Sequence, residues 1–181
     1  MKTRSFIHLL HPRETIELIV LIGGGLLIVF LGQYFGASIA LLLTWLIVVW
    51  AAAKTVYYFG ETLWHLVQAT ASDLPYHRFL LLMAYNMAEV TLSYAIDFFC
   101  LLQIDRTNFS GIDENLSGAS LMFECLYFSV LNFSFFGYGD ITPSTIPAKL
   151  VMLLEVITAF TTVIFLISDF VSMKDSMKRS R

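Results

Sequence analysis

The chain has 181 residues, of which 57% are hydrophobic and only 14% are charged. Because soluble domains carry about a quarter charged residues, this composition excludes an ordinary soluble domain and indicates an integral membrane protein. The net charge of −3 and the lack of a basic patch give no support for nucleic-acid binding. The sequence also lacks a Ser-His-Asp set, a metal-spaced Cys/His cluster and a phosphate-binding Gly loop, so an enzyme is not expected.

Two apolar runs near the amino terminus predict a hairpin over residues 1–58. The first run follows a basic stretch, extends to Phe35 and is too long for a cleavable signal peptide. The glycines at 23–25 within it favour close approach of a neighbouring helix. Residues 39–58 form the second predicted span. Neither run has the regularly spaced Arg residues of a voltage-sensing helix.

Residues 59–78 are predicted to form an amphipathic segment that lies along the inner membrane surface. Its cations, together with the basic stretches at both ends of the sequence, predict a multi-pass protein with both termini cytoplasmic. All four histidines map to the same side. They are expected to be ordinary interfacial residues, with a proton sensor as the alternative.

The third predicted span, residues 79–103, is unusually polar. Four polar residues recur at intervals of three, four and four and share one helix face: Asn86, Glu89, Ser93 and Asp97. Intramembrane carboxylates are costly and by default face protein or water. This face is expected to hydrogen-bond the back of a pore loop, with a direct ion or proton role for Glu89 and Asp97 as the alternative. No cation is expected at mid-membrane depth, because Lys54 and Lys149 lie at span ends.

The remaining elements follow in a simple order. Residues 104–118 predict an exposed outer loop, and residues 119–133 have the length of a short helix. Residues 147–172 form the fourth predicted span, in which Glu155 lies close in depth to Asp97. Two cysteines, Cys100 and Cys125, fall in apolar sequence and are expected to be buried free thiols.

The most informative stretch lies between the short helix and the fourth span, at Phe135-Phe136-Gly137-Tyr138-Gly139-Asp140. Two glycines that flank an aromatic residue accept φ > 0, which lets consecutive carbonyls point to one side. At these residues the chain resembles the pore domain of potassium channels, whose carbonyl rings replace the hydration shell of the ion. The resemblance extends to Tyr127-Phe128-Ser129 before the motif and to Ile141-Thr142-Pro143 after it.

The resemblance implies an all-α integral membrane fold with four transmembrane helices. Residues 79–181 are then a pore domain made of an outer helix, a re-entrant pore helix, a filter and an inner helix. It further implies a homotetramer in the lipid bilayer of the cell membrane, because a ring around an ion needs about four strands. Gly139 completes the filter, and no other cofactor is expected. Potassium ions are expected at the carbonyl oxygens of Phe135, Phe136, Gly137 and Tyr138.

One filter position departs from the family pattern, because Phe135 stands where the family has Thr. A phenyl ring has no hydroxyl to offer, so the innermost ion site is expected to be weakened. The ring is expected to point inward or partly inward and to act as a hydrophobic constriction. In the alternative, it packs outward against the inner helix near residues 158–162.

The filter also needs support from behind and from its outer end. Many family members pair the Asp after the filter with an acid in the pore helix, but Leu131 stands at that position. Tyr127 is therefore the expected partner of Asp140. At the back of the filter, Glu155, Asp97 and Glu89 are expected to hold the pore loop.

These observations predict a passive, potassium-preferring cation channel with a non-standard inner site at Phe135. One alternative is a weakly selective or non-conducting channel relative. A further alternative is a proton-coupled carrier or membrane signalling subunit that uses Glu89 and Asp97.

Overall fold

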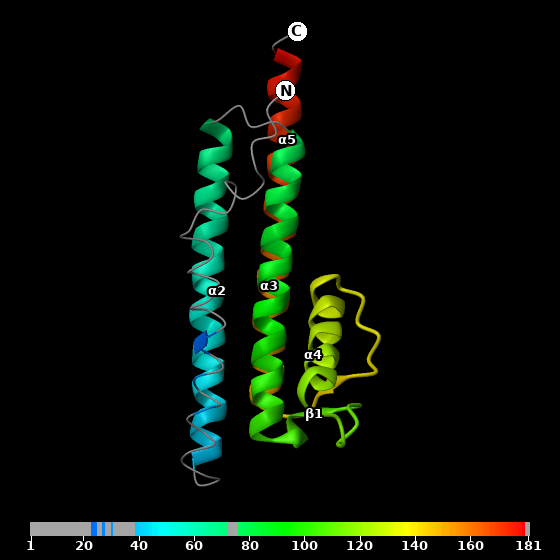
Figure 1. The fold of residues 1–181 in the computed structure, drawn as a ribbon. Coiled ribbons are helices and arrows are strands. Elements are labelled where there is room, and N and C mark those ends of the chain that lie inside the picture. Colours follow the sequence, from blue (N-terminus) through cyan, green and yellow to red (C-terminus); the bar gives the residue numbers. More distant parts are fainter. Residues whose placement is uncertain (1–22, 25–26, 28–29, 31–38, 72–75, 180–181) are drawn as a thin grey trace, which may run out of the picture.

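The computed structural model describes residues 23–24, 27, 30, 39–71 and 76–179. The main helices in this part of the chain are α2 (Ala40–Ala71), α3 (Tyr76–Ile104), α4 (Gly118–Phe133) and α5 (Ile146–Arg179). Between them lie the 3₁₀ turn η3 (Arg106–Asn108) and the two-residue strands β1 (Phe109–Ser110) and β2 (Thr142–Pro143). Figure 1 shows α2, α3 and α5 side by side, with α4 against one end of α3.

Three helices in the described residues are long and apolar enough to cross a membrane. These segments are Ala40–Gly60, Met83–Ile104 and Ile146–Ser168, and they correspond to the second, third and fourth predicted spans. α4 is apolar but has only 16 residues, fewer than the roughly 20 that a spanning helix needs. The predicted first span falls almost entirely outside the described residues, so the count of four spans stays a prediction.

Two helices continue beyond the predicted spans. α2 passes Tyr58 without a break and ends at Ala71, so the predicted boundary between residues 58 and 59 is not a helix end. α5 likewise continues past residue 172 to Arg179. The physical reason is that the amphipathic stretch after residue 58 keeps the helical period, and extending a formed helix is easy compared with nucleating one.

α3 is the central helix of the bundle. It packs on α2, α4 and α5, and 67% of its span is buried, against 33% for α2 and 28% for α5. Phe98 of α3 meets Phe128 of α4 and Phe109 of β1 edge to face, with ring centroids 4.9 and 5.6 Å apart. Such aromatic contacts contribute about 0.5–1.5 kcal/mol each beyond the buried area, so they hold the short helix against α3. Cys100 and Cys125 are both buried and free, as predicted.

The segment between α3 and α5 enters the bundle and leaves it at the same end. β1 follows the end of α3, and β2 pairs with it so that Phe109 lies opposite Pro143 and Ser110 opposite Thr142. Figure 1 shows α4 extending from this end toward the middle of the bundle, after which the chain returns to the β1 end. Residues 134–141 are therefore the returning limb of a re-entrant loop.

Candidate functional site

The backbone of the returning limb alternates in the sign of φ. Phe135, Gly137 and Gly139 have positive φ angles of 58°, 47° and 76°, whereas φ is negative at Phe136 and Tyr138 between them. In a regular strand, with every φ negative, successive carbonyls point to opposite sides. Alternation of the sign of φ turns them toward a common side, and glycine accepts positive φ readily. The limb thus has the backbone conformation that a row of carbonyl ligands requires.

The side chains of the limb leave the backbone accessible. The rings of Phe136 and Tyr138 stack with centroids 5.7 Å apart and planes 20° apart. A Cβ atom added to Gly137 or Gly139 would have no neighbour within 4 Å. Phe136 and Tyr138 are 67% and 70% exposed in the single chain, so both rings are open to contact with other chains.

Phe135 combines a large side chain with a left-handed backbone. Its φ of 58° is the only positive value at a non-glycine position in the described residues. Its ring lies edge-on to Phe160 of α5, with centroids 6.2 Å apart. Phe135 remains 50% exposed and Phe160 remains 59% exposed. The two aromatic residues form one patch at the junction of the limb and the inner helix.

α4 ends directly at the limb, without a linker. The N–H groups of Ser134 and Phe136 donate to the carbonyls of Val130 and Leu131 at 3.0 and 2.9 Å. The Ser134 hydroxyl also donates to the Val130 carbonyl at 2.8 Å. The carboxyl end of a helix carries about half a negative elementary charge. A cation just beyond this end is therefore electrostatically favoured.

Asp140 at the outer end of the limb is held by two contacts. Its Oδ1 accepts a hydrogen bond from the Ile141 N–H at 2.9 Å. A hydrogen bond to Asp140 is also the main cause that raises the pKa of Tyr127 above its ordinary value. Tyr127 therefore lies near enough to Asp140 to interact with it.

Gly111 of the outer loop touches the limb at the same point. It has a φ of 89°, and a Cβ added to it would lie 1.8 Å from the Asp140 carbonyl oxygen. Next to it, the Ser110 and Thr142 hydroxyls are 2.7 Å apart. The outer loop therefore lies in backbone contact with the end of the limb, and only glycine fits at position 111.

Glu155 of α5 holds α4 from behind. It is fully buried, and its carboxyl group accepts hydrogen bonds from Ser129 and from Asn132 Nδ2, the latter at 3.1 Å. The Ser129 hydroxyl also reaches the Thr91 carbonyl of α3 at 2.8 Å. Ser129 thus connects Glu155 of α5 to the backbone of α3.

The expectation that no cation lies at mid-membrane depth is wrong. Lys54 is 1% exposed, and its Nζ lies 2.5 Å from Asp97 Oδ2 and 2.8 Å from Ser93 Oγ. Because α2 continues to Ala71, Lys54 is an interior residue of the helix rather than its end. Asp97 therefore has a cation for a partner.

The polar face of α3 consequently contacts α2, whereas the sequence analysis predicted that it would contact the pore loop. Ser93 and Asp97 bind Lys54, and buried Glu89 interacts electrostatically with Tyr58 of α2. No donor among the described residues reaches Asn86 Oδ1. Of the acids predicted to support the limb from behind, Glu155 contacts α4 and Asp97 contacts α2.

Sequence reasoning assigned no supporting contact to Ser129, Asn132 or Gly111. Ser129 and Asn132 are polar residues three positions apart on a mostly apolar helix. Helical periodicity places them on a shared face, which was a usable signal. Gly111 lies in a loop where a lone glycine is unremarkable, so no local signal marks its contact with Asp140.

Comparisons with known proteins agree on one family. Residues 87–174 match the family model described as "Ion channel". Over 93 residues, the chain is 32% identical to "Two-pore potassium channel 4" of Arabidopsis thaliana. The matched segment covers 51% of this chain and 30% of that protein. The match therefore spans less than a third of the length of the relative. No solved structure matches the chain at a significant level.

Proposed function

We propose that this chain, whose residues 87–174 match the ion channel family model, forms a passive, potassium-preferring cation channel. The observation that carries the proposal is the alternation of φ at Phe135, Gly137 and Gly139 in a re-entrant limb at the end of α4. The printed name of the plant relative, a potassium channel, supports the choice of ion.

In the proposed mechanism, backbone carbonyls replace water around a potassium ion as it enters the limb. The ligands are the carbonyl oxygens of Phe135, Phe136, Gly137 and Tyr138, with Gly139 at the outer end. The carboxyl end of α4 adds a favourable field for a cation at the inner end of the limb. Conduction needs no covalent step and no proton transfer, because ions move from site to site down their gradient.

One chain supplies one limb, so a closed ring of carbonyls requires about four chains. We propose a homotetramer, in which neighbouring chains cover the exposed rings of Phe136 and Tyr138. The basic stretches at both ends of the sequence support an orientation in the cell membrane with both termini cytoplasmic. In this orientation the β1 end of the bundle faces outward.

A second candidate, a weakly selective or non-conducting channel relative, is favoured by Phe135. The ring lies beside Phe160 of α5 and remains half exposed in the single chain. Phe160 falls within the 158–162 stretch of the outward alternative, so one side of the Phe135 ring packs on the inner helix. In the proposed tetramer, the exposed side of four such rings would narrow the path and repel water where it faces the axis. The carrier alternative has less support, because Asp97 is bound to Lys54.

The test is potassium flux from liposomes that contain the purified chain, measured under a potassium gradient and then under a sodium gradient. Gly137→Ala forces an alanine to a φ of 47° in open space, so it disturbs the limb but little packing. Gly118→Ala is the matched control, because Gly118 has a φ of 55°, also has no neighbour within 4 Å, and lies outside the limb. We expect potassium flux to exceed sodium flux, to disappear in Gly137→Ala and to persist in Gly118→Ala. Wild-type flux in Gly137→Ala contradicts the carbonyl filter.

A further inference from the structure

Lys54 is a buried cation that lies outside the segment shared with the ion channel family. It belongs to α2, whereas the matched segment begins at residue 87. Its Nζ binds Asp97 Oδ2 at 2.5 Å and the Ser93 hydroxyl and carbonyl oxygens at 2.8 and 3.1 Å. It also lies 5.1 Å from the centroid of the Tyr94 ring. A buried charge inside a membrane bundle is costly, so a functional role for this contact is worth testing.

The neighbouring residue of α2 makes a second connection. Thr55 Oγ1 and the Tyr94 hydroxyl are 2.6 Å apart, and the Tyr94 hydroxyl lies 3.1 Å from Thr158 Oγ1 on α5. These hydroxyl groups form a chain that runs from α2 through α3 to α5. Lys54 and Thr55 thus fix one turn of α2 against both membrane-spanning helices of the pore domain.

The same stretches of α3 and α5 hold the pore helix α4. The Thr91 carbonyl accepts from Ser129, and it lies two residues before Ser93, which binds Lys54. Glu155 binds α4 and lies one helical turn before Thr158. α2 and α4 lie on different sides of α3 (Figure 1), so one short part of the bundle connects the two helices.

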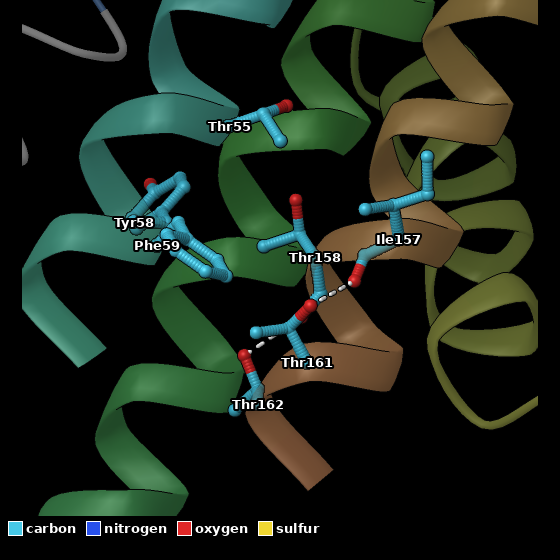
Figure 2. Close-up of a pocket in the computed structure, with 7 residues that line it drawn as sticks. All are labelled: Thr55, Tyr58, Phe59, Ile157, Thr158, Thr161 and Thr162. Carbon is cyan, nitrogen blue, oxygen red and sulfur yellow. Dashed lines mark hydrogen bonds between the residues drawn. The ribbon is translucent and has the colours of Figure 1, made fainter. Parts of the chain in front are cut away.

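The contact between α2 and α5 is incomplete beside this connection. A pocket of about 20 Å³ lies between them, lined by Thr55, Tyr58, Phe59, Ile157, Thr158, Thr161 and Thr162. Figure 2 shows the α2 side chains facing the α5 threonines across it. It has room for about one water molecule. The polar contacts of Lys54 and Thr55 thus lie beside a small gap in the packing of α2 on α5.

We propose that Lys54 is a positioning residue for the ion filter, which acts by fixing the Thr91–Asp97 stretch of α3 against which α4 is held. Lys54 touches no ion. It sets the position of Ser129, and through it the end of α4 from which the filter limb begins. This inference rests on the proposed function, and it assigns to α2 a role in ion selectivity.

Two variants of the 181-residue chain test it. Lys54→Met combined with Asp97→Leu removes both charges and leaves no buried charge unpaired, which keeps the fold accessible. Ser93→Ala removes one acceptor of Lys54 and leaves the ion pair in place. Lys149→Met is the control, because Lys149 is an exposed lysine on α5. The first measurement is the ratio of potassium to sodium flux in liposomes. The second is the difference in Tm between KCl and NaCl, which reports ion binding without conduction.

We expect the flux ratio to fall by about two- to tenfold in the double variant, the effect of one lost hydrogen bond at the filter. The potassium-dependent Tm difference should shrink with it, Ser93→Ala should show a smaller loss, and the control should show none. An assembled double variant with wild-type selectivity overturns the proposal. Loss of assembly in the double variant also overturns it, because Lys54 is then a folding residue. If the wild type shows neither flux nor a potassium-dependent Tm, the proposed function fails instead.

Discussion

Phe135 occupies a backbone conformation that glycine usually adopts. Its φ of 58° costs a non-glycine residue about 1–2 kcal/mol, and the ring contact with Phe160 offsets part of this cost. Strained residues that persist in a fold are often part of its mechanism. The contact therefore connects the inner helix α5 to the innermost carbonyl of the proposed filter.

Replacement of Phe135 should change conduction. Phe135→Thr restores a hydroxyl group and removes bulk, so we expect several-fold higher potassium flux and a higher ratio of potassium to sodium flux. Because β-branched residues fit poorly at positive φ, Phe135→Ser is the companion variant with the same hydroxyl group. Potassium and sodium flux from liposomes, with assembly checked for each variant, measures this effect. If both variants assemble and conduct no better than the wild type, Phe135 is a packing residue and the constriction lies elsewhere.

At the scale of elements, α4 is held at its two sides by Glu155 and by Asp140. Glu155→Gln keeps an acceptor for Asn132 and supplies amide hydrogens for Ser129, so stability and flux should change little. Glu155→Leu leaves the buried Asn132 amide without its acceptor and leaves Ser129 with only the Thr91 carbonyl, so it should destabilise the protein by about 1–3 kcal/mol. Thermal unfolding of both variants measures the difference. Equal Tm values for Gln and Leu contradict the role of these hydrogen bonds.

The contact between Tyr127 and Asp140 should depend on pH. Because Asp140 raises the pKa of Tyr127 above its ordinary value of 10, the folded state holds this proton more tightly than the unfolded chain. The contact therefore stabilises the fold fully below pH 10 and loses this effect as pH rises further. Tyr127→Phe should lower the Tm and conductance at neutral pH, and the Tm difference from the wild type should shrink in strongly alkaline buffer. A Tm difference that is absent at neutral pH counts against the pair.

Elements were easier to predict than the contacts between them. The helix predicted at 119–133 begins one residue earlier in the structure, and the span predicted at 79–103 is a helix from Tyr76 to Ile104. Apolar length and the positions of the polar stretches determine these bounds, and both are local properties of the sequence. The end of α2 was less predictable, because a helix that passes from an apolar to an amphipathic stretch shows no break in its period.

The partners of the polar residues could not be read from local pattern. Helical spacing correctly put Ser93 and Asp97 on one face, but the direction of that face depends on the rotation of α3 within the bundle. Packing of all three neighbouring helices sets this rotation. Lys54 looked like a residue at the end of a span for the same reason, since its partner lies on another helix.

At the scale of the whole molecule, the proposed filter needs more than the single chain supplies. The rings of Phe136 and Tyr138 in the limb are largely exposed, and a Cβ added at Gly137 or Gly139 would have no neighbour within 4 Å. Phe160 of α5, Gly111 of the outer loop and the end of α4 contact this limb. The other side is open, and a ring of carbonyls needs further copies to close it.

The last prediction concerns this closure. We expect a native mass of four chains in mild detergent, and a higher Tm in KCl than in NaCl, because ions that bind only the assembled filter stabilise it by mass action. At a potassium concentration of about 100 times Kd, this effect is about 2.7 kcal/mol. Phe136→Ser removes one of the exposed rings and should weaken assembly, whereas Gly137→Ala should preserve the mass but lose the potassium effect. A stable monomer with a potassium-dependent Tm contradicts the shared filter, since a single limb cannot surround an ion.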